Sequence, residues 1–93
     1  MICKEDCIAF AGLTAEEIDA IAEHEHLGEI GAAALADYLL HLEHGPERIR
    51  RMMVDDIRDA LMHDRTAHAA ELTTALRHFL AEHPEARIDP KAA

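Results

Sequence analysis

Tryptophan is absent from this sequence of 93 residues, and its aromatic side chains are one tyrosine and two phenylalanines. Glycine occurs only four times and proline three times. Because strands are enriched in aromatic and β-branched residues, and tight turns in glycine and proline, this composition argues against a sheet. Alanine, leucine and glutamate are abundant instead, which is typical of helices. We therefore predict one all-α domain formed by residues 1–93.

Basic residues are scarce as well, with nine against nineteen acidic ones and a net charge of -10. This charge repels phosphate backbones and anionic lipid, so we expect neither nucleic acid nor a membrane as a partner. Cations or a basic protein are the favoured partners. Every apolar run is far shorter than a membrane span, and the first residues lack the basic-then-apolar order of a secretory signal. We therefore expect a cytoplasmic protein.

Cysteine is limited to Cys3 and Cys7, which we expect to be reduced in the cytoplasm. Their spacing would place both thiols on one face of a helix, where His24 and His26 would complete a zinc site of two thiolates and two imidazoles. In the alternative interpretation, Cys7 packs in the core as a small apolar residue and Cys3 belongs to a loose terminus.

Capping signals and the spacing of apolar residues predict the helices. Thr14 and Glu17 form a capping box, which marks a helix start. Gly45 and Pro46 end one helix and begin the next. The predicted fold is a small all-α bundle of four helices with a short N-terminal turn (1–12), helices at about 14–27, 30–44, 46–63 and 64–82, and a frayed tail (84–93).

The turn between the last two predicted helices contains neither glycine nor proline. One continuous helix over residues 47–82 is therefore an alternative, and it would give an extended, dimeric molecule. Residues 30–44, IGAAALADYLLHLEH, form the most apolar stretch and are predicted as the central helix. Leu35, Leu39 and Leu42, with Tyr38 and Gly31 beside them, are its expected core face. Because alanines on its other side also need cover, we predict a homodimer that forms through the central or the last helix.

Eight histidines and nineteen acidic residues give each predicted helix a set of such side chains at helical spacing. Random placement would yield on the order of four such sets, so the surroundings must decide which of them is a site. The second set lies among apolar residues and is the favoured one of the four, although hydrogen-bonded histidines at an interface are favoured over metal ligands even there. The third and fourth sets are interpreted as solvated surface. The sets are Asp19, Glu23 and His26; Asp37, His41 and His44; Asp56, Asp59 and His63; and His68, Glu71 and His78.

Two segments carry a resemblance to known proteins. Glu23 and His26 form a Glu-x-x-His pair, which resembles the pairs in ferritin-like di-iron proteins; the resemblance implies iron bound between paired helices, with a homodimer supplying the second pair. Residues 21–40, IAEHEHLGEIGAAALADYLL, together with Arg77-His78-Phe79 and His83-Pro84, resemble small helical bacterial proteins of unassigned function. That resemblance implies a shared histidine-rich bend and no particular activity.

These patterns predict a metal-binding helical protein that uses zinc or iron. A zinc ion would have a structural role, whereas iron would be stored or oxidised at paired sites. No set of residues predicts a catalytic triad, a phosphate loop or a nucleotide site. The alternative is a non-enzymatic, acidic protein–protein interaction module whose histidines add pH sensitivity. The candidate metal ligands are Glu23, His24, His26, Asp37, His41, His44, Cys3 and Cys7.

Overall fold

The computed structural model describes residues 13–87 of the chain, and the predicted N-terminal turn with Cys3 and Cys7 lies outside this range. All secondary structure in the described range is helical, which confirms the predicted all-α fold of four helices. The elements are α2 (Ala15–Glu25), α3 (Glu29–Leu40), α4 (Gly45–Met62), α5 (Thr66–Glu82) and a short 3₁₀ helix, η1 (Pro84–Arg87).

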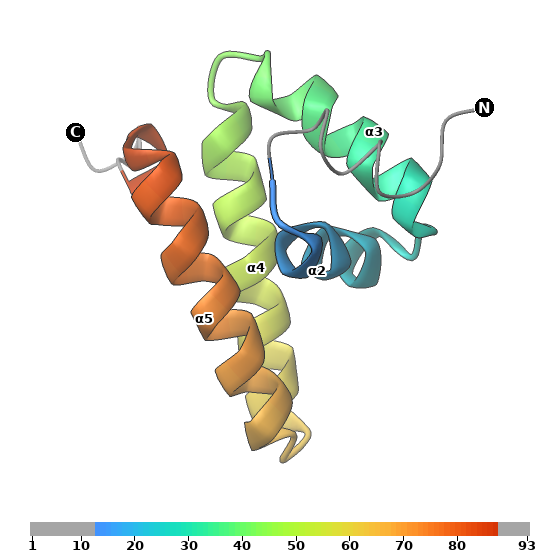
Figure 1. The fold of residues 1–93 in the computed structure, drawn as a ribbon. Helices are drawn as coiled ribbons and strands as arrows, with labels where there is room; N and C mark the ends of the chain where they lie inside the picture. The colour runs from blue at the N-terminus through green and yellow to red at the C-terminus, as the bar shows by residue number, and fades with distance from the viewer. Residues whose placement is uncertain (1–12, 88–93) are drawn as a thin grey trace.

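The two longest helices, α4 and α5, form an antiparallel hairpin that runs the length of the molecule (Figure 1). Helix α2 packs against the middle of this hairpin and contacts both of its helices, and α3 lies across α2 and the start of α4. The alternative of one continuous helix is therefore wrong. At the tip of the hairpin, Asp64 adopts a left-handed conformation with φ 58° and the amide of Arg65 donates to the carbonyl of Ala60.

Helix α2 begins at the predicted capping box. The amide of Glu17 donates to Thr14 Oγ1 over 3.2 Å, and the amide of Thr14 donates to Glu17 Oε1 over 2.8 Å. Leu13 and Ile18 flank the box and are both buried, as expected for a hydrophobic staple. The helix ends at Glu25 because His26 adopts a left-handed conformation with φ 55°.

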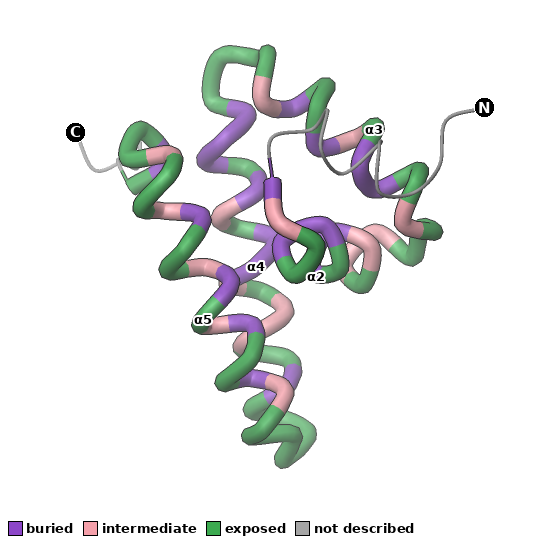
Figure 2. The backbone as a smooth tube through the Cα atoms, in the orientation of Figure 1, coloured by how far each residue is buried: buried purple, intermediate pink, exposed green. Residues whose placement is uncertain are grey.

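Helix α3 buries only part of the face predicted for it, and buried and exposed stretches alternate along the helix (Figure 2). Leu39 is buried and Leu35 half-buried as expected, but Tyr38 is 62 % exposed and Leu42, which lies beyond the end of the helix, is 38 % exposed. Three alanines complete the buried face instead. Small side chains let α3 approach α2 and α4 closely, so this face packs without large residues. Self-association through α3 or α5 stays a prediction. The buried residues of α3 are Ala32, Ala33, Ala36 and Leu39.

The core lies where α2, α3 and the hairpin meet, and Phe79 is the largest side chain within it. Ile49, Met53 and Leu72 are buried in the same core, whereas Leu61 is exposed. None of the helices within residues 13–87 is long and apolar enough to cross a membrane.

The predicted frayed tail begins later than expected. Residues 84–87 form η1, which packs against α4 and α5, and Ala86 in it is fully buried. The prediction of a tail from residue 84 is therefore wrong for these four residues, because Ala86 supplies an apolar contact that closes this end of the core.

Candidate functional site

The predicted ligands on the central helix do not point the same way. Helix α3 ends at Leu40 instead of continuing to residue 44, so His44 leaves the line of Asp37 and His41. His41 Nδ1 donates to the Asp37 carbonyl over 2.7 Å, and His44 Nδ1 donates to Glu47 Oε2 over 3.0 Å. These histidines therefore make local contacts with their own chain neighbours.

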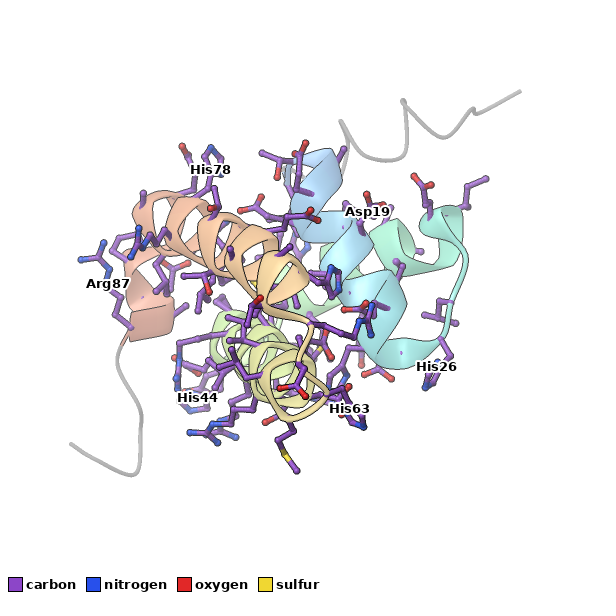
Figure 3. The ribbon with its side chains drawn as sticks, turned by 90° about the horizontal axis from the view of Figure 1, so that it is seen from below. Asp19, His26, His44, His63, His78 and Arg87 are labelled. Carbon is purple, nitrogen blue, oxygen red and sulfur yellow. The ribbon has the colours of Figure 1, made fainter. Side chains whose placement is uncertain are left out.

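The predicted ligands at the end of α2 take part in contacts with the hairpin. Glu23 Oε1 accepts a hydrogen bond from His68 Nε2 on α5 over 2.6 Å, and His24 Nε2 lies 3.8 Å from Asp55 Oδ2 on α4. His26 is exposed at the left-handed end of the helix (Figure 3). Within residues 13–87, no three His, Cys, Asp or Glu side chains are grouped so that they could hold a metal ion. The zinc site with Cys3 and Cys7 lies outside the described range and stays a prediction.

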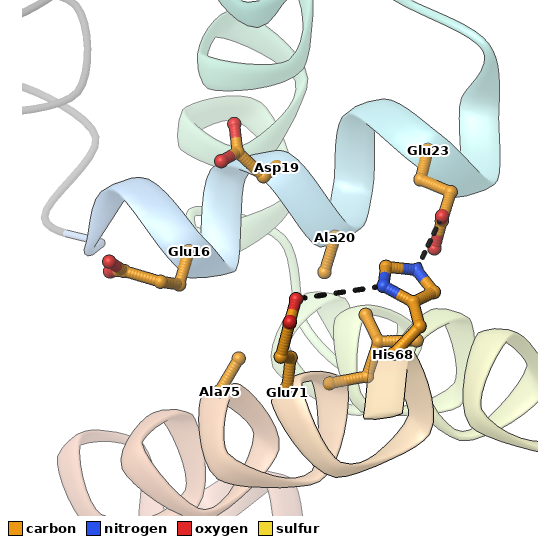
Figure 4. Close-up of a pocket in the computed structure, with 8 residues that line it drawn as sticks. Glu16, Asp19, Ala20, Glu23, His68, Glu71 and Ala75 are labelled. Carbon is orange, nitrogen blue, oxygen red and sulfur yellow. Dashed lines mark hydrogen bonds and ion pairs between the residues drawn. The ribbon is translucent and has the colours of Figure 1, made fainter. Parts of the chain in front are cut away.

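A hollow of about 240 Å³ lies between α2 and α5, and we call it the acidic groove (Figure 4). Its apolar part is formed by small or aliphatic side chains that are buried: Ala20, Leu72 and Ala75. Carboxylates stand around this apolar part, two from the start of α2, one from its last turns and one from α5. The complete lining is Glu16, Asp19, Ala20, Glu23, His68, Glu71, Leu72 and Ala75.

His68 joins the two helices that form the acidic groove. Its Nε2 contacts Glu23 of α2 at 2.6 Å, and its Nδ1 lies 3.8 Å from Glu71 Oε2 of α5, so the imidazole stands between two carboxylates (Figure 4). The side chain remains 29 % exposed. His68 is therefore held in the groove and still reaches solvent.

A second hollow of about 250 Å³, which we call the junction hollow, shares Glu23 and His68 with the acidic groove. It lies where α2, α4 and the hairpin turn meet, and three histidines and three carboxylates line it. Within the described residues, His24 Nδ1 and Asp56 Oδ2 are buried without a hydrogen-bond partner, although Glu25 Oε1 lies 3.6 Å from the former. The complete lining is Glu23, His24, His26, Asp56, Asp59, Ala60, Arg65 and His68.

The Asp56 carboxyl is half-buried beside other carboxylates, and its pKa is raised. The pKa of Asp56 is raised from 3.8 to about 6: burial is the largest cause and the carboxylates of Glu23, Asp55 and Asp59 add to it, while His24 opposes it. Removing a carboxylate from water disfavours its charged form. The folded protein therefore holds a proton at Asp56 more tightly than the unfolded chain does.

This shift predicts an unusual pH dependence of stability. Because the folded-state pKa of Asp56 is raised, Asp56 adds to the free energy of unfolding at low pH. This contribution is fully present below pH 3.8 and is lost as the pH rises through about 6. We expect Asp56→Asn to remove this loss, so that the free energy of unfolding of the variant, relative to wild type, increases from about pH 4 to about pH 7. Chemical denaturation across this range measures it. Asp64→Asn, which removes an exposed carboxylate of the hairpin turn that is not among the groups shifting the pKa of Asp56, should keep the wild-type slope. A pH profile of Asp56→Asn that runs parallel to wild type would contradict the assignment.

In the first turn of α2, a buried carboxylate makes a third contact between a histidine and an acid on different helices. Glu17 is 1 % exposed, and its Oε2 lies 3.2 Å from His78 Nδ1 of α5. The interpretation of the third and fourth sets as solvated surface is thus wrong for Asp56 and His68, which are half-buried, whereas His78 is exposed as expected although it contacts Glu17. Spacing along one helix carries no signal for contacts between helices, and the sequence pattern therefore does not reveal these residues.

Comparisons with protein-family models, with curated proteins and with solved structures find no match for this chain, and the resemblances noted from the sequence stay predictions. The function is therefore inferred from the geometry of the acidic groove and the junction hollow.

Proposed function

We propose that this protein is a non-enzymatic interaction module that binds a basic segment of a partner protein in the acidic groove. One observation carries the proposal: an apolar floor of Ala20, Leu72 and Ala75 is bordered by carboxylates of two helices. This combination matches lysine and arginine side chains, which bury an aliphatic stem and keep a charged end group near water.

The charge of the whole molecule supports the same partner chemistry. With a net charge of -10, the protein attracts cationic chains over distances longer than direct contact, and this attraction raises the association rate. Within the groove, Glu16, Asp19, Glu23 and Glu71 are the receiving carboxylates. Exposed ion pairs contribute only about 0.2–1 kcal/mol each, so four of them give about 4 kcal/mol at most, which corresponds to a roughly millimolar Kd. Burial of aliphatic stems on the apolar floor adds about 0.8 kcal/mol per CH₂ group, so we expect an affinity between roughly millimolar and micromolar.

A peptide titration tests the proposal. A fluorescent amphipathic peptide that carries lysines along one face should bind saturably at low salt, as measured by fluorescence anisotropy. Affinity should fall steeply as ionic strength rises from about 0.01 M to about 0.1 M, because the screening length falls from about 30 Å to about 10 Å. A peptide with glutamate in place of lysine is the control. Equal binding of both peptides, or no saturation at low salt, would refute the proposal.

The junction hollow favours metal binding as a second candidate function. Its unpartnered Asp56 Oδ2 and His24 Nδ1, together with the raised pKa of Asp56, are features of a site that lacks a positive charge. A zinc or iron ion would use these side chains only if the Glu23–His68 hydrogen bond opened, since no three ligands converge in the described part of the chain. Elemental analysis of untagged protein and melts with and without chelator test it; a metal-free protein that melts identically in both would exclude a structural metal.

A further inference from the structure

We propose that the outer side of α3 is the contact surface of a weak homodimer, in which two copies of the chain pack their α3 helices antiparallel across a two-fold axis. The inference does not depend on the acidic groove, whose lining residues all belong to α2 and α5. Helix α3 lies on the side of the molecule away from α5 (Figure 1).

Exposed apolar side chains gather on α3. Within residues 13–87, six large apolar side chains are exposed, and four of them lie on α3 or within two residues of its ends. Ile30, Ala34 and Tyr38 follow one another at intervals of four residues, so they lie on the same side of the helix, and all three are exposed. The Leu27 side chain lies beside Gly31 on this surface. The α3 face is therefore defined as Leu27, Ile30, Gly31, Ala34 and Tyr38.

The charge of the α3 face favours a second copy over a basic partner. Residues 27–42 carry only two charged side chains, Glu29 and Asp37, whereas 30 % of the whole chain is charged and its net charge is -10. Two copies with this net charge repel each other, and the repulsion is smallest where carboxylates are few. A basic segment finds little attraction on this face. An apolar and nearly uncharged surface fits it, and the α3 face of another copy is such a surface.

The order of large and small side chains along the α3 face is self-complementary. Gly31 lies three positions before Ala34, and Tyr38 lies four positions after it. A two-fold axis beside Ala34 brings the same patch of both copies together in reversed order. Tyr38 of each copy would then lie over Gly31 of the other, where the absence of a side chain leaves room for the ring. Small residues let the two helices approach closely, and the antiparallel arrangement places opposite ends of the helix dipoles side by side.

The extent of the α3 face predicts a weak association. A helix of 12 residues is about 18 Å long and about 10–12 Å wide, so one side of α3 provides a strip of roughly 200 Å². Interfaces of standard size bury about 800 Å² of accessible surface per partner. We therefore expect a dissociation constant between roughly 0.1 and 1 mM, and a protein that is monomeric at low micromolar concentration.

Tyr38 reports on the α3 face directly, because it is the only tyrosine and the chain contains no tryptophan. Sedimentation equilibrium and acrylamide quenching of Tyr38 fluorescence are measured on the full chain from about 10 µM to about 1 mM. We expect the average mass to rise from one copy toward two, and the quenching constant to fall over the same range because the second copy covers Tyr38. Raising the ionic strength from about 0.01 M to about 0.1 M should strengthen this association, since it screens the repulsion between two acidic copies.

Ala34→Lys is the decisive variant, and Ala70→Lys is its matched control. Both replace an exposed alanine within a helix and change the net charge equally, but Ala34 belongs to α3 and Ala70 to α5. Ala34→Lys should weaken dimerisation at least tenfold, because two like charges would meet beside the two-fold axis. Ala70→Lys should dimerise at least as strongly as wild type, because it lowers the net negative charge. Circular dichroism shows that each variant is folded, and Tyr38 of Ala34→Lys should be quenched equally at every concentration.

Three results would overturn the inference. A mass that stays at one copy up to about 1 mM, with Tyr38 open to quencher, would leave the α3 face without a partner. A constant mass with Tyr38 shielded at every concentration would assign the face to another part of the same chain, such as residues 1–12. Dimerisation that Ala70→Lys abolishes and Ala34→Lys preserves would place the contact on α5. None of these results changes the expectation for peptide binding in the acidic groove, which is measured at lower protein concentration.

Discussion

Replacing Gly45 with alanine is expected to destabilise the protein by about 3 kcal/mol or more, which is a large effect for a single substitution. A Cβ atom at this position would lie 1.5 Å from the carbonyl oxygen of Leu39 and 2.5 Å from its carbonyl carbon. Both are backbone atoms, so no side-chain rotation can relieve the clash. The end of α3 would have to move away from the start of α4, and this would disturb the packing of Leu39 and Ile49 in the core.

Gly31→Ala is the matched control for this substitution. A Cβ atom on Gly31 would meet only the Leu27 side chain, at an ordinary contact distance of 3.6 Å. Since glycine within a helix costs about 0.5–1 kcal/mol relative to alanine, Gly31→Ala should stabilise α3 by that amount. Urea denaturation of both variants measures the difference. A Gly45→Ala protein as stable as wild type would show that α3 and α4 do not meet as closely as described.

Reversing two charges on the acidic groove is expected to weaken binding of a basic peptide about 100-fold. Glu16 and Glu71 stand on opposite walls of the groove, and Glu16→Lys combined with Glu71→Lys replaces two attractive contacts with two repulsive ones. Each reversal removes one attraction and adds one repulsion, each of about 0.7 kcal/mol, so each position changes affinity by roughly tenfold. The two positions belong to different helices, so their effects should add. The readout is the dissociation constant of the lysine peptide at low salt.

The control must carry the same net charge, because lowering the overall negative charge also slows association. Glu43→Lys combined with Glu82→Lys satisfies this condition: the Glu43 side chain is 90 % exposed, Glu82 is exposed, and neither lines the groove. Its affinity should stay within a few-fold of wild type. Equal losses in the two double variants would mean that the peptide senses only the total charge and that the groove is not a specific site.

Local signals account for the part of the fold that the sequence predicts. Thr14 and Glu17 mark the start of α2 through hydrogen bonds within four residues, and Gly45 with Pro46 separates α3 from α4. Such contacts depend only on neighbours in the chain, so they can be inferred without knowing the packing. The turn of the hairpin at Asp64 has no glycine or proline, and the sequence therefore leaves a continuous helix open as an alternative.

The site depends on contacts that local signals do not encode. Glu23 and His68 are 45 positions apart, and they meet because α2 crosses the hairpin. Each of them belongs to a set of acids and histidines at helical spacing on its own helix. Asp37 and His41 belong to a set of the same kind, yet both remain exposed. The sequence pattern favours Glu23, His24 and His26, and all three line the junction hollow, yet it assigns Asp56 and His68 to the solvent. The choice among many acids and histidines is made by helix packing.

The buried face of α3 shows the same limit. Size and hydrophobicity favour Tyr38 and Leu42 as core residues, but the structure buries alanines and leaves Tyr38 exposed. Close approach of helices is determined by the fit between small side chains, and the dispersion attraction between closely packed helices can outweigh the burial of one aromatic ring. A pattern of apolar residues alone cannot indicate which of two apolar faces fits its neighbours.

Residue-resolved mapping of the lysine peptide on wild-type protein at low salt tests the central claim most directly. Amide chemical shifts should change on titration at Ala20, Leu72 and Ala75, which form the floor of the acidic groove, and stay nearly constant on the exposed face of α3 around Tyr38. Changes centred on α3, or small changes spread over every acidic surface, would contradict the account.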